Sequence, residues 1–136
     1  MPPDISPVLY VSLSKEGALA EMSFRQSRLN PIPSKPILLH RLEVDLKRVV
    51  RITFEDLERL GISAAAYHSL SYARTQEIGD AACFLNFDGA IVPSARWRCE
   101  NLVIFEENIK MSPGFTALDS EEIDWKPWAE KNGFLQ

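Results

Sequence analysis

Glu21 is the residue of this sequence best suited to chemistry, because it places a carboxylate at the end of the apolar run of residues 18–20. On a helix, residues three positions apart share a side, so Glu21 lies at the edge of this apolar stripe. A carboxylate held in such a place can stabilise positive charge on a ligand. The alternative is an exposed glutamate that pairs with Arg25 one turn later, a small stabilising contact. The local pattern alone favours the pair with Arg25.

Ser94 and Tyr10 are two further candidates for ligand binding. Ser94 follows Pro93, which stops a short apolar strand predicted at residues 90–92, and loops at strand ends often carry binding groups. Tyr10 alternates with Val8 in a predicted strand, so its ring either stacks on a ligand or packs in the core. Local sequence favours the ordinary alternatives, which are a turn serine and a core tyrosine.

Other kinds of chemistry have little support in the sequence. Cys83 and Cys99 belong to no Cys-x-x-Cys pair or Cys/His cluster, which argues against a zinc site and a disulfide framework. His40 and His68 have no obvious partner nearby, and no Walker A, GxGxxG, HExxH or GxSxG motif is present. The formal charge of −4 argues against a direct binder of nucleic-acid backbones.

The sequence carries no sign of membrane insertion or export. No apolar run approaches the roughly 20 residues of a membrane span. The N-terminal residues 1–7 are rich in proline and lack the charged and apolar regions of a signal peptide. We therefore expect a cytoplasmic protein that does not associate with a membrane.

The candidate residues must be positioned by a strand, a helix and a second strand end. A strand is predicted at residues 8–13, followed by a helix that begins after the N-cap Ser14 and continues to about Arg28. Further strands are expected at residues 37–44, 48–53, 90–92 and 102–105, and further helices at residues 54–60 and 75–87. Helices and strands do not alternate regularly, so the expected class is α+β in a single domain over residues 1–136.

The end of the chain has its own pattern. Trp125 and Trp128 lie three residues apart, which places both on one side of a helix. We expect residues 108–136 to form a C-terminal tail that docks on the rest of the chain.

Several of these segments together resemble the RES domain, a family named for an arginine, a glutamate and a serine. The matching segments are LYVSLSKEGALAE at residues 9–21, TQEIG at 75–79, DGAIVPSAR at 88–96 and ENLVIF at 100–105. The resemblance covers residues 7–107. It implies a fold similar to that of ADP-ribosyltransferases, with a small mixed sheet and flanking helices.

The resemblance also implies an activity. RES family members are typically bacterial toxins of toxin–antitoxin pairs that consume NAD⁺. They cleave the bond between nicotinamide and ribose by phosphorolysis or hydrolysis, and some relatives transfer ADP-ribose to a protein. The implied partner is a DNA-binding antitoxin protein, and no metal is implied. The family glutamate falls on Glu21 as the catalytic residue, while the serine and tyrosine fall on Ser94 and Tyr10 as NAD-binding residues.

These side chains suit such a reaction. Nicotinamide leaves as its bond to ribose breaks, and positive charge builds on the ribose ring, as in glycoside hydrolysis. Glu21 would stabilise that charge and bind a ribose hydroxyl. Tyr10 would stack on a planar ring, and Ser94 would hydrogen-bond the nicotinamide amide or a phosphate.

One family residue has no counterpart in the sequence. The family arginine lies upstream of the tyrosine strand, whereas no arginine precedes Arg25 here. Arginine binds pyrophosphate in a bidentate way, so its loss would weaken NAD binding. The explanations are a start placed too late, a replacement by Arg96 or Arg74, and a truncated or inactive RES-fold module that only binds an antitoxin-like partner. Arg96 is our candidate for the NAD-binding replacement, and a homodimer is a further candidate assembly because a second copy would cover exposed core.

Overall fold

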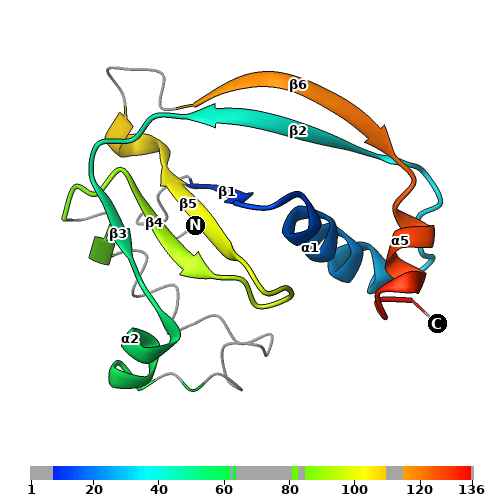
Figure 1. The fold of residues 1–136 in the computed structure, drawn as a ribbon, viewed down its shortest axis with the longest axis horizontal. Helices are drawn as coiled ribbons and strands as arrows, with labels where there is room; N and C mark the ends of the chain where they lie inside the picture. The colour runs from blue at the N-terminus through cyan, green and yellow to red at the C-terminus, as the bar shows by residue number, and fades with distance from the viewer. Residues whose placement is uncertain (1–7, 62, 64–80, 83–84, 110–114, 136) are drawn as a thin grey trace.

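The helices and strands of the chain confirm the expected α+β class (Figure 1). The computed structural model describes residues 8–61, 63, 81–82, 85–109 and 115–135. In chain order the elements are β1 (Val8–Ser12), α1 (Lys15–Ser27), β2 (Ile37–Val44), β3 (Val49–Arg51), α2 (Phe54–Arg59), β4 (Gly89–Pro93), β5 (Glu100–Phe105), the 3-10 turn η1 (Glu106–Ile109), β6 (Phe115–Ile123) and α5 (Trp125–Lys131).

The main sheet is mixed and has four strands in the order β1-β5-β4-β3. Strand β5 lies between β1 and β4 and is antiparallel to both, while β3 and β4 are parallel. Side chains alternate between the two faces of a strand. On one face of β4 and β5 the buried side chains Ala90, Val103 and Phe105 form a core cluster together with Ala82, and on the other face of β5 Leu102 and Ile104 are buried as well.

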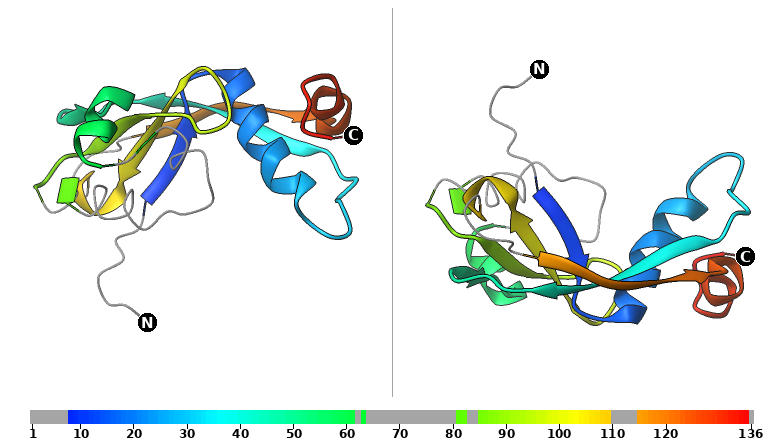
Figure 2. Two further views of the ribbon diagram at one scale, coloured as in Figure 1. Left: turned by 90° about the horizontal axis from the view of Figure 1, so that it is seen from below. Right: turned by 90° about the horizontal axis from the view of Figure 1, so that it is seen from above.

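A second sheet consists of the two long antiparallel strands β2 and β6. Figure 1 shows this ribbon passing along one side of the molecule and ending beside α5, and Figure 2 shows it from two further sides. Its register shifts between Arg41 and Leu42. The strand at 115–123 is absent from the sequence prediction, because almost all of its side chains are exposed. Its sequence therefore lacks the apolar alternation by which a strand is recognised.

Local sequence signals account well for α1. The hydroxyl of Ser14 accepts a hydrogen bond from the backbone N–H of Gly17 at 2.9 Å, which confirms the predicted N-cap. The helix ends at Ser27, and Arg28 is its C-cap, close to the predicted end. Its first residue, Lys15, forms an exposed ion pair of 2.6 Å with Glu121 of β6. That contact raises the pKa of the Lys15 ammonium, first through the hydrogen bond and then through charge attraction.

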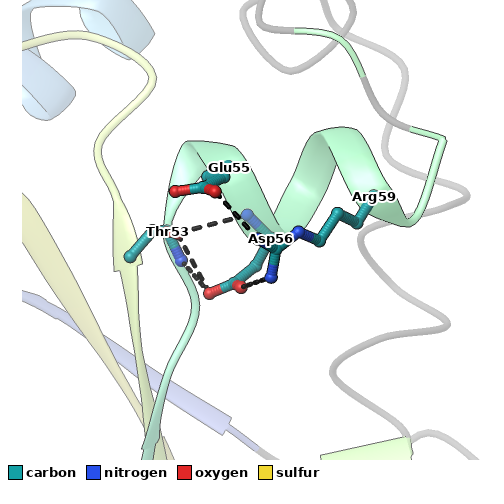
Figure 3. Close-up of polar contacts among 4 residues, drawn as sticks. All are labelled: Thr53, Glu55, Asp56 and Arg59. Carbon is teal, nitrogen blue, oxygen red and sulfur yellow. Dashed lines mark hydrogen bonds and ion pairs between the residues drawn. The ribbon is translucent and has the colours of Figure 1, made fainter.

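Helix α2 confirms the short helix predicted at residues 54–60. Thr53 and Asp56 form a capping box, in which the Thr53 hydroxyl accepts from the Asp56 N–H and the Asp56 carboxylate accepts from the Thr53 N–H (Figure 3). One turn further on, Arg59 donates to Glu55 at 2.8 Å. Gly61 follows with a φ of 87°, a left-handed conformation that suits glycine at a helix end.

The C-terminal helix α5 lies against α1, and the side chains of Trp125 and Ala129 are fully buried. On the same helix, the ring of Trp128 lies 5.3 Å from that of Trp97 and 5.8 Å from that of Phe134, measured between centroids. The end of the chain thus contacts the loop at residues 94–99, which joins β4 to β5.

Some expectations fall on residues outside the described ranges. These include most of the helix predicted at 75–87, the TQEIG segment, His68, Arg74 and Cys83. Ala81 and Ala82 are helical, and residues 85–86 form a turn.

Candidate functional site

The carboxylate of Glu21 is bound by two side chains from the far end of the sequence. Ser94 Oγ donates to Glu21 Oε1 at 3.0 Å, and Asn101 Nδ2 donates to the same oxygen at 3.2 Å. Glu21 is half-buried in the middle of α1, and Ser94 is only 3% exposed just after β4. Figure 1 shows the 94–99 loop reaching toward α1. The interpretation of Glu21 as a surface partner of Arg25 is wrong, since no ion pair joins these two described residues.

The residues of α1 that face the candidate site lie on one side of the helix. Gly17, Glu21, Phe24 and Arg28 are spaced by three or four residues and therefore lie on one side of the helix. A Cβ atom at Gly17 would collide with Cys99 Sγ and with Ser12 Oγ, so only glycine allows α1 to approach the sheet this closely. The close approach brings Glu21 within reach of β5.

The Ser94 hydroxyl has no hydrogen-bonding capacity left over. It donates its proton to Glu21 and accepts from the backbone N–H groups of Arg96 at 3.1 Å and Trp97 at 3.2 Å. A serine hydroxyl has one donor and two acceptor positions, and all three are used here. The arrangement holds the 94–99 loop in a tight turn and aims the hydroxyl proton at Glu21.

Asn101 completes the site, although the sequence reasoning assigned it no role. It lies on β5 opposite Ser12 of β1 and Val92 of β4. The sequence signal that could have identified Asn101 is its position, because asparagine is depleted in strands and this one directly precedes a run of buried apolar residues.

The side-chain amide of Asn101 must turn Nδ2 toward Glu21, since the opposite orientation would set two oxygens against each other. Asn101 Oδ1 is buried and accepts no hydrogen bond within the described structure.

Tyr10 lies on the same face of the sheet as Asn101. Its backbone pairs with Val103, two residues along β5 from Asn101, which places the two side chains diagonally across neighbouring strands. The Tyr10 side chain is 70% exposed, so its interpretation as a core residue is wrong. An exposed ring beside the site is available for stacking.

Arg96 projects from the 94–99 loop onto α1. Its guanidinium carbon lies 3.6 Å from the centroid of the Phe24 ring, and the guanidinium of Arg28 lies 5.2 Å from the same centroid. Phe24 comes one turn after Glu21 on the same side of α1. The permanently charged guanidinium groups of Arg96 and Arg28 therefore lie at the part of α1 that follows Glu21, within one to two helical turns of its carboxylate.

Two further features of the described residues concern metal ligands and membrane-spanning helices. Nowhere among them do three or more His, Cys, Asp or Glu side chains gather as metal ligands would. Within the same ranges, no helix has the length and apolar character needed to cross a membrane. His40 is exposed on β2.

The fold is similar to that of one solved toxin–antitoxin structure. A chain of the crystal structure of the M. tuberculosis MbcT–MbcA toxin–antitoxin complex matches with a TM-score of 0.74 and 22% sequence identity. The match covers 95% of this chain and 73% of that one. At this level of identity the similarity establishes a common fold. No curated protein sequence matches the chain.

The family assignment comes from the sequence itself. The RES domain profile matches residues 2–126, which is most of the chain and includes Tyr10, Glu21, Ser94 and Asn101. The resemblance inferred from the separate segments is thereby confirmed, and the chain belongs to the RES domain family.

Proposed function

We propose that this chain is the toxin of a toxin–antitoxin pair and that it cleaves the bond between nicotinamide and ribose in NAD⁺. The observation that carries the proposal is the fixed carboxylate of Glu21, which Ser94 and Asn101 bind through a single oxygen. Its second oxygen, Oε2, accepts no hydrogen bond from the described residues and remains for a ligand. Membership of the RES domain family and the shared fold with a chain of the MbcT–MbcA complex also support this function.

The proposed reaction needs little from the protein except electrostatic stabilisation. As the bond between ribose C1′ and the pyridinium nitrogen breaks, its electron pair moves to that nitrogen and neutral nicotinamide leaves. The ribose acquires positive charge, which Glu21 Oε2 would stabilise. An oxygen of phosphate or water then bonds to C1′, and in the case of water a proton passes to solvent. A protein side chain as acceptor would make the reaction an ADP-ribosyl transfer.

Ser94 and Asn101 would serve this reaction by fixing Glu21. Donors that already point at a carboxylate need no reorganisation as charge develops, which is the main advantage of a preorganised site. Because the Ser94 hydroxyl is fully engaged within the chain, we assign it a positioning role and not a direct contact with NAD⁺. Tyr10 would stack on a planar ring of the substrate, and Arg96 would bind its phosphates.

A direct test follows nicotinamide release from NAD⁺ by chromatography, with and without phosphate. Glu21→Gln keeps the shape of the side chain and should lower the rate roughly 100-fold or more, because the charge is lost. Glu16→Gln, at an exposed position five residues earlier on α1, is the matched control and should leave the rate unchanged. Equal rates for the wild-type chain and Glu21→Gln would disprove the catalytic role of Glu21.

The proposed partner is a DNA-binding antitoxin protein, as in a toxin–antitoxin pair. The chain with the shared fold comes from such a complex, which supports an antitoxin partner. Since NAD⁺ is an intracellular metabolite, the proposed place of action is the cytoplasm. Copurification with the product of the adjacent gene tests the pairing, and light scattering distinguishes that complex from a homodimer.

The second candidate function is a RES-fold module that binds the antitoxin without catalysis. It is favoured by the Ser94 hydroxyl, whose hydrogen-bonding positions are all used within the chain, so that none is left for NAD⁺. The discriminating measurement is nicotinamide release by this chain and by a chain extended with the residues encoded upstream. Release by neither chain, together with stable antitoxin binding, would favour the binding module.

A further inference from the structure

An open groove of about 560 Å³ lies between the C-terminal end of α1 and the last residues of the chain. Phe24, Ser27 and Arg28 form one wall, and residues 133–135 form the other, with Ile32 beside them. Small-molecule sites typically have volumes of about 300–1,000 Å³, so the groove has a suitable size for a ligand. The lining residues carry one cationic side chain and no carboxylate, which suits an anion.

A series of side-chain contacts through Phe24 and Arg96 connects the groove to the Glu21 site. Phe24 lines the groove and also carries the guanidinium of Arg96 on its ring. The backbone of Arg96 in turn donates to the hydroxyl of Ser94, which binds Glu21. With a rise of ~1.5 Å per residue, Arg28 lies about 10 Å along the helix axis from Glu21.

We propose that this groove binds the adenosine monophosphate half of a dinucleotide whose other half lies at Glu21. This inference rests on the proposed function, because it gives the direction in which NAD⁺ lies along α1. The ribose to be cleaved lies at Glu21, the pyrophosphate lies between Arg96 and Arg28, and the adenine base lies in the groove.

The side chains in and beside the groove suit these chemical groups. Guanidinium groups bind phosphate oxygens in a bidentate way, and both arginines are held near the Phe24 ring. Beyond Arg28 the lining becomes apolar at Ile32, Phe134 and Leu135. A planar base gains most from such a surface, because it can pack its face on an aromatic ring while its edge stays in water.

Trp128 lies next to the groove, so its fluorescence can report binding of a ligand there. The ring of Phe134 stacks on Trp128 with an angle of 18° between the planes, and Trp128 contacts Trp97. A base that packs against Phe134 should therefore change tryptophan fluorescence. This signal does not depend on cleavage of any bond.

The test is a titration of the full chain with adenosine monophosphate, followed by tryptophan fluorescence and by calorimetry. Arg28→Gln should weaken binding roughly 10- to 100-fold, as expected when a charged hydrogen-bond donor is lost. Arg28 is exposed at the helix end, so this change should not disturb folding. Arg25→Gln is the matched control, since Arg25 is an exposed arginine of the same helix outside the groove, and it should bind like the wild-type chain.

Steady-state kinetics provide a second, independent test of the proposed adenosine site. Arg28→Gln should raise KM for NAD⁺ and leave KM unchanged for nicotinamide mononucleotide, which lacks the adenosine half. If adenosine monophosphate does not bind, or binds equally to the wild-type chain and Arg28→Gln, the groove is not the adenosine site. Arg28-dependent binding without any cleavage of NAD⁺ would support the groove while disproving the proposed reaction.

Discussion

Ser94 Oγ lies 3.0 Å from Glu21 Oε1, although 73 positions separate the two residues in the sequence. The contact joins the centre of α1 to the end of β4. It exists because β1 and β4 flank the same strand, β5, and because α1 follows directly after β1. The mixed sheet therefore sets the distance between the carboxylate and its donors, while the short 94–99 loop sets their angle.

Asn101 should act on catalysis through Glu21. Asn101→Ala removes one of the two donors to Glu21 Oε1, so the carboxylate is less firmly held. We expect kcat to fall about 10-fold or more with little change in KM, as is typical when a preorganising contact is lost. Asn101→Asp should be more damaging, because it places a second carboxylate against the first. The measurement is the steady-state rate of nicotinamide release, and a change confined to KM would contradict the positioning role.

Ser94 and Asn101 should show coupled effects, because they bind the same oxygen. Ser94→Ala removes a donor to Glu21 and leaves two backbone N–H groups of the 94–99 loop without their acceptor. We expect a loss of unfolding free energy of about 1–3 kcal/mol in addition to the loss of rate. In a double-mutant cycle with Asn101→Ala, the losses in rate should not add. Strict additivity would mean that the two side chains act on the reaction independently.

Helix α1 and the strands of the main sheet could be predicted from local sequence signals. Ser14 as N-cap, the prolines after residue 30 and the apolar strands at β4 and β5 are all visible within a few positions. Strand β6 could not be found in this way, because its stability comes from backbone pairing with β2 and its side chains are mostly exposed. For such a strand the sequence carries almost no periodic pattern.

The candidate site was harder to predict than the fold, since its key contacts are long-range. For Glu21 the local sequence offers Arg25 as partner, whereas the actual donors Ser94 and Asn101 lie 73 and 80 positions away. Only the resemblance to a family indicated that Glu21 and Ser94 belong together. The resemblance did not reveal that the Ser94 hydroxyl is saturated by backbone groups, because that depends on the geometry of the 94–99 loop.

Gly17→Ala should destabilise the chain, although alanine is the better helix former. The new Cβ atom would collide with Cys99 Sγ and Ser12 Oγ, so α1 would have to move away from the sheet. We expect a loss of about 1–3 kcal/mol in unfolding free energy, measured by urea denaturation. Ala18→Gly, at the next position of the same helix, should cost only about 1 kcal/mol through propensity and is the reference. A gain of stability in Gly17→Ala would show that the contact is not tight.

Stability at acidic pH should depend in part on the capping box of α2. The backbone N–H of Thr53, and then its hydroxyl, hold the pKa of the Asp56 carboxyl below its usual value, with a smaller contribution from Arg59. A lowered pKa stabilises the folded chain above the unfolded pKa of about 3.9, and this contribution is lost as pH falls through the folded pKa. Asp56→Asn should therefore lower stability at neutral pH and have a smaller effect at strongly acidic pH. Urea denaturation across this range measures the difference, with Glu58→Gln on the same helix as control. A constant difference between wild type and Asp56→Asn at all pH values would contradict the assignment.

Trp128 should influence the reaction although it lies in the C-terminal helix. Its ring contacts Trp97, whose backbone N–H binds the Ser94 hydroxyl, so α5 supports the turn that aims Ser94 at Glu21. Trp128→Ala removes an aromatic contact worth about 0.5–1.5 kcal/mol beyond its buried area and should loosen the 94–99 loop. We expect a lower kcat and faster hydrogen exchange at the Trp97 amide, whereas Trp128→Phe should retain most of both properties. Exchange that stays slow in Trp128→Ala, with kcat unchanged, would show that the loop holds its shape without α5.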